Sequence, residues 1–92
     1  MLESHAEVLI DRPARWAKQL ADHFSHKITV EERPEGRVLI LAVGEGVVAH
    51  NDIAVLLTAR AATADELTRV QDVLARHLER FAHREEITVS WS

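Results

Sequence analysis

The chain switches between two hydrophobic periods, and each change of period marks a predicted element. Residues 5–10 (HAEVLI) predict a short first strand. Apolar side chains then recur with the period of an amphipathic helix, which predicts a helix over about residues 13–25. Asp11 is the expected N-cap, and Pro13 fits the first helical turn. The apolar stripe of this helix consists of Ala17, Leu20, Ala21 and Phe24.

Four strands are predicted between this helix and a second one. They are short runs rich in β-branched and aliphatic residues, and residues typical of turns separate them. The expected strands cover residues 28–33, 37–43, 47–50 and 53–59, with turns at 34–36 (Pro-Glu-Gly), 44–46 (Gly-Glu-Gly) and 50–52 (His-Asn-Asp).

A capping box predicts the start of the second helix. Thr63 can accept a hydrogen bond from the third helical N–H, and Glu66 can reach back to the cap. The outer face carries the pairs Asp65/Arg69 and Asp72/Arg76 at i, i+4, with the acid first. The apolar stripe consists of Leu67, Val70, Val73, Leu74, His77, Leu78 and Phe81.

The chain is expected to end in a strand over residues 86–91 (EITVSW). Its alternation places Ile87, Val89 and Trp91 on one face and Thr88 and Ser90 on the other.

One stretch occurs twice, as HFSHKITVEE (23–32) and as RFAHREEITVS (80–90). In each copy it spans the end of a helix and the turn into the next strand. The repeat predicts two β-α-β units related by an approximate two-fold axis. The expected fold is a single α+β domain over residues 1–92. It is a two-layer sandwich with both helices on one face of an antiparallel sheet, in the order β-α-β-β-β-β-α-β, ferredoxin-like or TBP-like.

The two-fold axis has consequences for the residues of the repeat. Phe24 and Phe81 are expected to be buried alike, each at the end of an apolar stripe. His26 and His83, at equivalent helix ends, are expected to lie toward opposite ends of the domain and therefore not to share a metal ion.

Two inner strands are apolar on both faces. We expect Val38, Ile40 and Ala42 to face the helices, which leaves Leu39, Leu41 and Val43 on the outer face, together with Leu56. A sheet face with this much apolar surface predicts an interface. A homodimer is the expected occupant, and a small apolar ligand is the alternative.

Composition excludes several function classes. The 92 residues carry a formal net charge of −4 with basic and acidic residues interspersed, which argues against nucleic acid as a partner. Without cysteine there is no thiolate nucleophile and no thiolate metal site. The chain shows no serine elbow and no phosphate-cradling glycine loop, so we expect neither catalysis nor a cofactor. Neither a membrane span nor a signal peptide is apparent, which predicts a cytoplasmic location.

Six histidines raise the question of a metal site. Only His23 and His26 have ligand-like spacing, at i, i+3, and a tight site needs a third or fourth ligand. The alternative is that imidazoles near helix C-termini interact with the last carbonyl groups and the helix dipole, which we favour for His26 and His83. His77 falls within an apolar stripe and is expected to be a partly buried, hydrogen-bonded core histidine.

The segments KQLADHFSHKITVE and HLERFAHREEITVSW resemble a small bacterial family, domain of unknown function 2218, over roughly residues 5–91. The resemblance implies no activity. Relatives lie beside or are fused to flavin-dependent siderophore-interacting proteins, which implies an iron-acquisition setting and a possible reductase partner. Carried over by position, the implied functional surface consists of His23, His26, Lys27, Arg84, Glu85 and Glu86.

Two functions are therefore expected. The first is a non-enzymatic, dimeric accessory or interaction domain in the cytoplasm. The alternative is a module that binds a metal ion or an iron chelate through His23 and His26.

Overall fold

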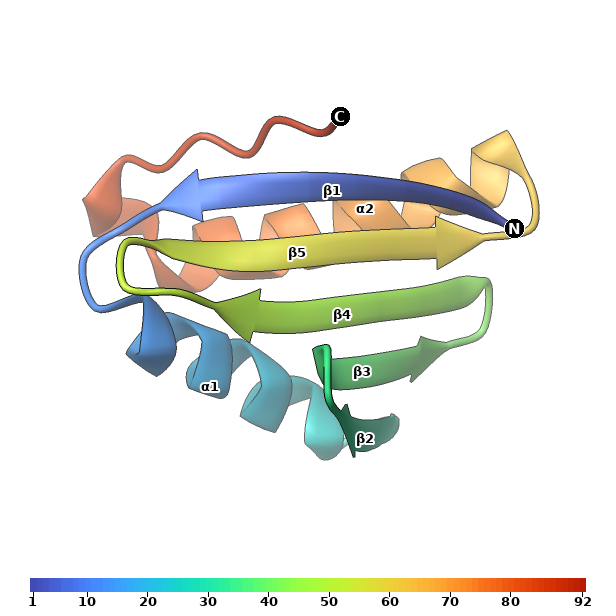
Figure 1. Ribbon diagram of the computed structural model, residues 1–92, viewed down its shortest axis with the longest axis horizontal. Coiled ribbons are helices and arrows are strands. Elements are labelled where there is room, and N and C mark those ends of the chain that lie inside the picture. The colour runs from blue at the N-terminus through green and yellow to red at the C-terminus, as the bar shows by residue number, and fades with distance from the viewer.

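Two helices pack on one face of a five-stranded antiparallel sheet in the computed structural model, which describes all 92 residues (Figure 1). The strand order across the sheet is β1-β5-β4-β3-β2. The predicted α+β sandwich is thereby confirmed. Its elements are β1 (Leu2–Leu9), α1 (Pro13–Ser25), β2 (Thr29–Arg33), β3 (Gly36–Leu41), β4 (Gly44–His50), β5 (Ala54–Ala61), α2 (Ala64–Phe81) and the short 3-10 helix η1 (His83–Glu85).

The core lies between the sheet and the two helices. Leu20 and Phe24 from α1 and Leu74 and Leu78 from α2 are buried against the inner sheet face, as their helical spacing predicts. The strand residues in this core cluster are Ala6, Val8, Leu39, Val48, Val55, Leu57, Ala59 and Ala61. In addition, the Gln71 amide donates a hydrogen bond of 2.7 Å to Ser4 and so ties α2 to β1.

The two helix starts differ in how well the sequence anticipates them. Thr63 caps α2 as predicted, because its hydroxyl oxygen accepts a 3.2 Å hydrogen bond from the Glu66 N–H. The predicted cap at Asp11 is wrong, since Arg12 occupies the N-cap of α1 in a left-handed conformation with no side-chain cap. The Asp11 carbonyl instead accepts a hydrogen bond from the Trp16 indole at 3.0 Å. The expected i, i+4 ion pairs on α2 do not form.

The turn between β3 and β4 lies earlier than the sequence predicts. Gly44 pairs with Leu41, so residues 42–43 make the turn and the glycines belong to β4. A Cβ on Gly46 would lie 2.9 Å from a methyl carbon of Leu74. The glycines therefore allow α2 to approach the strand closely, and a turn is not their role here.

The predicted facing of β3 is wrong. Leu39 is fully buried in the core and Leu41 packs against it, while Val38 and Ile40 belong to the outer face. Val43 lies in the turn and also packs against the core. Of the four residues expected on an outer dimer or ligand face, only Leu56 lies there. Residues 38–43 are all apolar, so their alternation does not show which side of the strand faces the helices.

The C-terminal residues 87–92 run beside β1 without forming the predicted strand (Figure 1). One reciprocal pair of backbone hydrogen bonds, 2.9 and 3.0 Å long, joins Ser92 to His5. The predicted facing is nevertheless confirmed. Ile87, Val89 and Trp91 pack against the core, and Thr88 and Ser90 are exposed.

We predict unequal effects for the two phenylalanines of the repeat. Phe24 is 6% exposed, whereas Phe81 is only partly buried, so the expectation of equal burial is wrong. Phe24→Ala should cost about 3–5 kcal/mol of unfolding free energy, and Phe81→Ala clearly less. Chemical denaturation of both variants measures the difference, with His83→Ala as a control for a helix-end change. Equal losses at the two phenylalanines would contradict this assignment.

We also predict that Gly44→Ala destabilises the protein more than Gly46→Ala. A Cβ at residue 44 would lie 2.1 Å from the backbone carbonyl oxygen of Arg60, which the sheet holds in place. At residue 46 the closest atoms are the methyl carbons of Leu74, which can shift by rotation of the side chain. Thermal unfolding of both variants tests this order, and a more severe loss at residue 46 would show that the Leu74 side chain is the more rigid neighbour.

Candidate functional site

A groove of about 640 Å³ lies along α1 and reaches the end of α2. It is called the histidine groove here. Its lining is almost entirely polar, with Phe81 as the only apolar residue. The residues that line it are Arg15, Lys18, Gln19, Asp22, His23, His26 and Phe81.

Four rings from both helices pack together at one end of the histidine groove. The His23 ring meets the Phe81 ring edge-on, with 5.1 Å between the centroids, and lies 5.3 Å from the His77 ring. The Phe24 and His77 rings are tilted against each other, with 4.7 Å between their centroids. Edge-to-face contacts of this kind fix ring orientation. The two helices therefore hold His23 in place through aromatic packing.

His77 has a defined tautomer in this cluster. Its Nδ1 lies 2.6 Å from the Val73 carbonyl oxygen, which can only accept, so Nδ1 carries the proton. The lone pair of the neutral ring is then on Nε2. The prediction of a partly buried, hydrogen-bonded histidine is confirmed. The His23 side chain, by contrast, makes no hydrogen bond within the chain.

Burial lowers the pKa of His23 below its ordinary value of 6.5, and positive charge nearby lowers it further. The contributing groups are His77, Lys27, His26 and Arg80, in that order. His23 is therefore neutral at pH 7, with a lone pair available to a ligand. The same neighbours make the groove unfavourable for any additional cation.

Basic side chains outnumber acidic ones around the groove. Asp22 is the only carboxylate in the lining, and Lys18 donates to it at 2.6 Å. This hydrogen bond is the main cause of the lowered pKa of Asp22. Arg15 and Arg80 form no ion pair; the Arg15 guanidinium lies over the Trp16 ring, 5.7 Å from its centroid. The groove therefore carries positive charge that no carboxylate of this chain neutralises.

The structure brings together only part of the surface that the resemblance implied. His23 and His26 line the groove, and Lys27 adds charge to it. Arg84, Glu85 and Glu86 are exposed and make no side-chain hydrogen bond or ion pair. His26 and Phe81, one from each copy of the repeat, line the same groove, whereas His83 is not among its lining residues, so the expected separation of His26 and His83 stays a prediction.

The roles expected for the helix-end histidines are met in one case of two. The His83 imidazole reaches the Arg80 carbonyl at 3.3 Å, as expected near a helix C-terminus. The His26 imidazole makes no such contact. No group of three or more His, Cys, Asp or Glu side chains is arranged to hold a metal ion.

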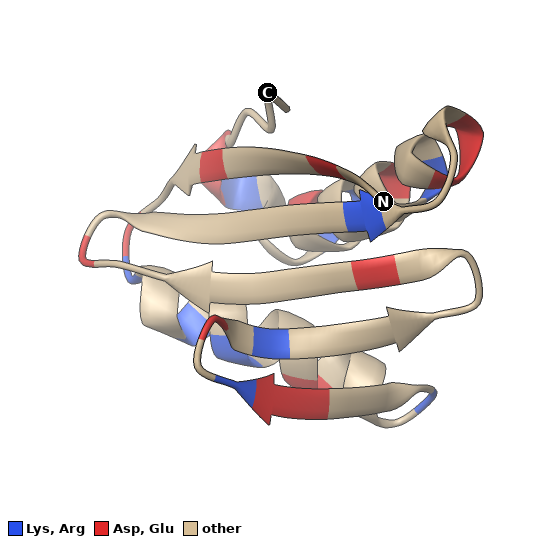
Figure 2. Cartoon of the chain, turned by 45° about the vertical axis from the view of Figure 1, so that its right-hand side comes forward, with Lys and Arg blue, Asp and Glu red and all other residues tan.

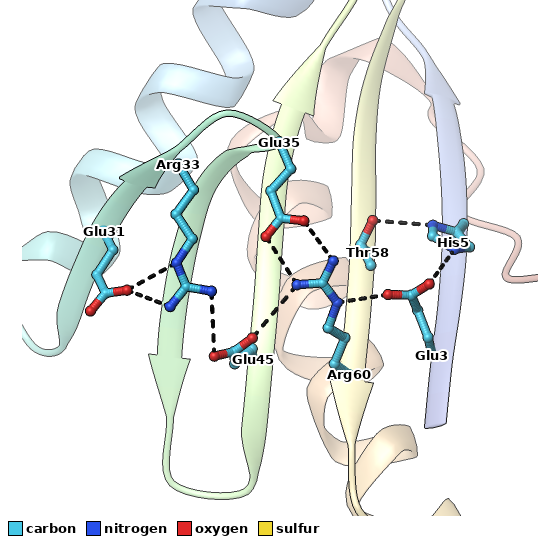
Figure 3. A network of polar contacts seen from close by, with 8 residues as sticks. All are labelled: Glu3, His5, Glu31, Arg33, Glu35, Glu45, Thr58 and Arg60. Atoms are coloured by element: carbon cyan, nitrogen blue, oxygen red, sulfur yellow. Dashed lines mark hydrogen bonds and ion pairs between the residues drawn. The ribbon is translucent and has the colours of Figure 1, made fainter. Parts of the chain in front are cut away.

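A second polar arrangement, which sequence reasoning missed, covers one end of the outer sheet face (Figures 2 and 3). Arg60 lies at its centre. Its guanidinium group donates to both Glu35 oxygens, at 2.6 and 3.0 Å, and to Glu3 at 2.6 Å. These bonds raise the pKa of Arg60 and lower those of Glu35 and Glu3. Arg33 extends the network by pairing with Glu31 and, at 3.7 Å, with Glu45.

The outer-face network continues onto β1 through a histidine. The Glu3 carboxylate lies 3.1 Å from Nε2 of His5, and Nδ1 of His5 lies 3.1 Å from the Thr58 hydroxyl (Figure 3). The alternation of apolar and polar residues along 2–9 and 54–61 indicates which side chains of each strand share a face. It could be used only once the register His5↔Thr58 was known.

Comparisons with known proteins find a matching family and similar solved structures. The sequence profile of the family described as "Uncharacterized protein conserved in bacteria (DUF2218)" matches residues 5–92. The solution structure of PA4090 from Pseudomonas aeruginosa is 28% identical, with a TM-score of 0.82, covering 100% of this chain and 96% of that one. A search of curated proteins finds no match.

A second solved structure agrees in fold alone. It is a de novo designed protein with a ferredoxin fold, 11% identical, with a TM-score of 0.55, covering 100% of this chain and 84% of that one. Neither helix of the present structure has the length and apolar character needed to cross a bilayer.

We predict a pH-dependent contribution of His23 to stability. Because its folded pKa is lowered, the unfolded chain takes up a proton near pH 6.5 that the folded chain does not. The free energy of unfolding should fall between about pH 7 and about pH 5.5, and it should fall less in His23→Gln. Urea denaturation at both pH values measures this. The carboxylates with lowered pKa values change stability only at more acidic pH. An identical fall in the free energy of unfolding of wild type and His23→Gln would therefore show that His23 does not titrate differently on folding.

Proposed function

The chain belongs to the family of uncharacterized bacterial proteins whose profile matches residues 5–92, and for it we propose a role as a non-catalytic accessory domain that binds an anionic metal chelate. The proposed site is the histidine groove. The single observation that carries the proposal is the combination of an aromatic cluster with unneutralised positive charge in one groove. This proposal refines the metal or iron-chelate module expected from His23 and His26.

Electrostatics favours a chelate over a bare metal ion. A divalent cation at His23 would meet the positive charges of Arg15, Lys27 and Arg80 without a carboxylate to offset them. Two imidazoles alone also fall short of the three or four ligands of a tight site. An anionic complex, whose metal ion is already coordinated, is instead attracted by the positive charges of the same groove.

The shape and lining of the groove suit a ligand with flat rings. Its volume of about 640 Å³ lies within the usual range of sites for small molecules. The His23 and Phe81 rings offer apolar surface, and Arg15 offers a planar guanidinium group that can pair with an oxygen anion. A ferric catecholate combines these features, since it has aromatic rings and carries net negative charge.

The resemblance adds a setting for this activity. Relatives beside or fused to siderophore-interacting reductases imply that iron chelates are present where such domains work. Under this proposal the domain holds the chelate in the cytoplasm and the reductase, as a partner, acts on it. The chain itself supplies no redox group, so reduction falls to the partner.

Dimerisation is a separate expectation, and it has lost most of its motivation. Leu39 is fully buried and Leu41 packs against the core, so the apolar outer face is smaller than predicted. Light scattering at micromolar concentration tests the homodimer directly.

We predict that the protein binds a ferric tris-catecholate complex and that Arg15→Glu weakens this binding by about tenfold or more, since the variant replaces attraction with repulsion. Isothermal titration calorimetry measures the affinity. Arg69→Glu is the matched control. Arg69→Glu makes the same charge change on α2. Residue 69 lies eleven residues before Arg80 and therefore about 16 Å from Arg80 along the helix axis.

Titration with zinc and ferrous ions tests the alternative of a bare-metal site. Wild type and the double variant His23→Ala, His26→Ala should bind both ions equally weakly. Tight zinc binding that the double variant loses would show a bare-metal site. Equal binding of the chelate by wild type, Arg15→Glu and Arg69→Glu would remove the proposed chelate site.

A further inference from the structure

A second hollow, of about 510 Å³, lies on the outer sheet face, where β1 and β5 meet the C-terminal segment. It is called the outer-face pocket here. It faces away from the histidine groove, which lies on the helix layer. Its polar lining residues are His5, Glu7, Glu35, Thr58, Ser90 and Ser92, and neither lysine nor arginine lines it.

The hydrogen bonds around His5 fix the polarity of Thr58. Glu3 accepts at Nε2 of His5, so in the neutral ring Nε2 carries the proton and Nδ1 is an acceptor. Thr58 must then donate its only hydroxyl proton to Nδ1, at 3.1 Å. The remaining capacity of the Thr58 oxygen is as an acceptor. With His5 neutral, a ligand that meets Thr58 in the pocket must therefore be a donor.

The carboxylates of the pocket differ in how far they are neutralised. Arg60 holds Glu35 with two hydrogen bonds, as it also holds Glu3. The Glu7 carboxylate has neither a hydrogen bond nor an ion pair within the chain. On the whole outer face, five carboxylates stand against two guanidinium groups, which leaves a formal charge of −3. They are Glu3, Glu7, Glu31, Glu35 and Glu45 against Arg33 and Arg60.

Apolar side chains complete the pocket. Leu56 lies opposite Glu7 on one side and opposite Ala49 on the other, and Val47 beside them is almost fully buried. Glu7 and Thr58 are diagonal neighbours on adjacent strands, since His5 pairs with Thr58 and Glu7 with Leu56. Diagonal neighbours lie about 7–8 Å apart, a gap that one group donating two hydrogen bonds of about 2.9 Å can bridge as the side chains lean inward.

We propose that the outer-face pocket binds a small primary amine. Its ammonium group donates to the Glu7 carboxylate and to the Thr58 hydroxyl oxygen, and its alkyl part lies on Leu56 and Ala49. An ammonium group has three donors and no acceptor, which matches a lining of acceptors with surplus negative charge. A carboxylic acid meets the wrong charge here, and a neutral alcohol leaves Glu7 without a counter-ion.

NMR titration of the ¹⁵N-labelled protein with n-butylamine, n-butanol and sodium butyrate at neutral pH tests this proposal. We expect n-butylamine alone to shift the backbone amides of Glu7, Leu56 and Thr58. Glu7→Gln should weaken binding at least about fivefold, because it removes a charge-assisted hydrogen bond, and Thr58→Val should weaken it as well. Glu79→Gln on α2 is the matched control and should leave binding unchanged.

Two results would overturn the proposal. Equal shifts with n-butanol would show that the pocket takes alkyl chains regardless of charge. Unchanged n-butylamine binding in Glu7→Gln would show that the carboxylate does not take part. Arg15→Glu changes only the histidine groove and should leave amine binding intact, so the two sites can fail or succeed independently.

Discussion

The close approach of α2 to β4 is the constraint on which the rest of the structure depends. Leu74 packs where a side chain on Gly46 would be, and Val70 lies close to Gly44. This contact decides which face of β4 is buried. Through the registers Leu39↔Gly46 and Gly46↔Ala59 it also decides the inner face of β3 and β5, and Ala59↔Ser4 extends it to β1. The outer face of the sheet, with Thr58 and Arg60, follows from the same contact.

The two faces of the domain differ in charge as a result. The helix layer collects Arg15, Lys27 and Arg80 around aromatic rings, whereas the outer sheet face carries more carboxylates than guanidinium groups. A net charge of −4 conceals this separation, because composition reports only the sum. Ligands of opposite charge therefore suit opposite faces, and long-range attraction would guide each to its own side.

The two copies of the repeated stretch have similar local sequences but only partly similar structures. Its two copies do end two helices, and Phe24 is buried as its position in the stripe predicts. Phe81 has the same local pattern but lies at the rim of the histidine groove against His23. The second copy also leads into an extended segment held by one backbone pair to β1, where the first leads into a paired strand. Equivalent local sequence thus meets unequal surroundings, since the neighbours of a side chain are set by the whole fold.

The sequence by itself determined the two helices, the cap at Thr63, the turns at 34–36 and 50–52, and the α+β class. These depend on contacts within a few residues, so periodicity and turn chemistry report them directly. Only the tertiary structure decided the facing of β3, because residues 38–43 are all apolar and their alternation does not show which side packs on the helices. It also decided that His23, His77 and Phe81 meet, and that Glu3, His5, Thr58 and Arg60 form one network. Each group joins two segments that lie more than fifty residues apart in the chain and are brought together by strand register and helix packing, which no local pattern encodes.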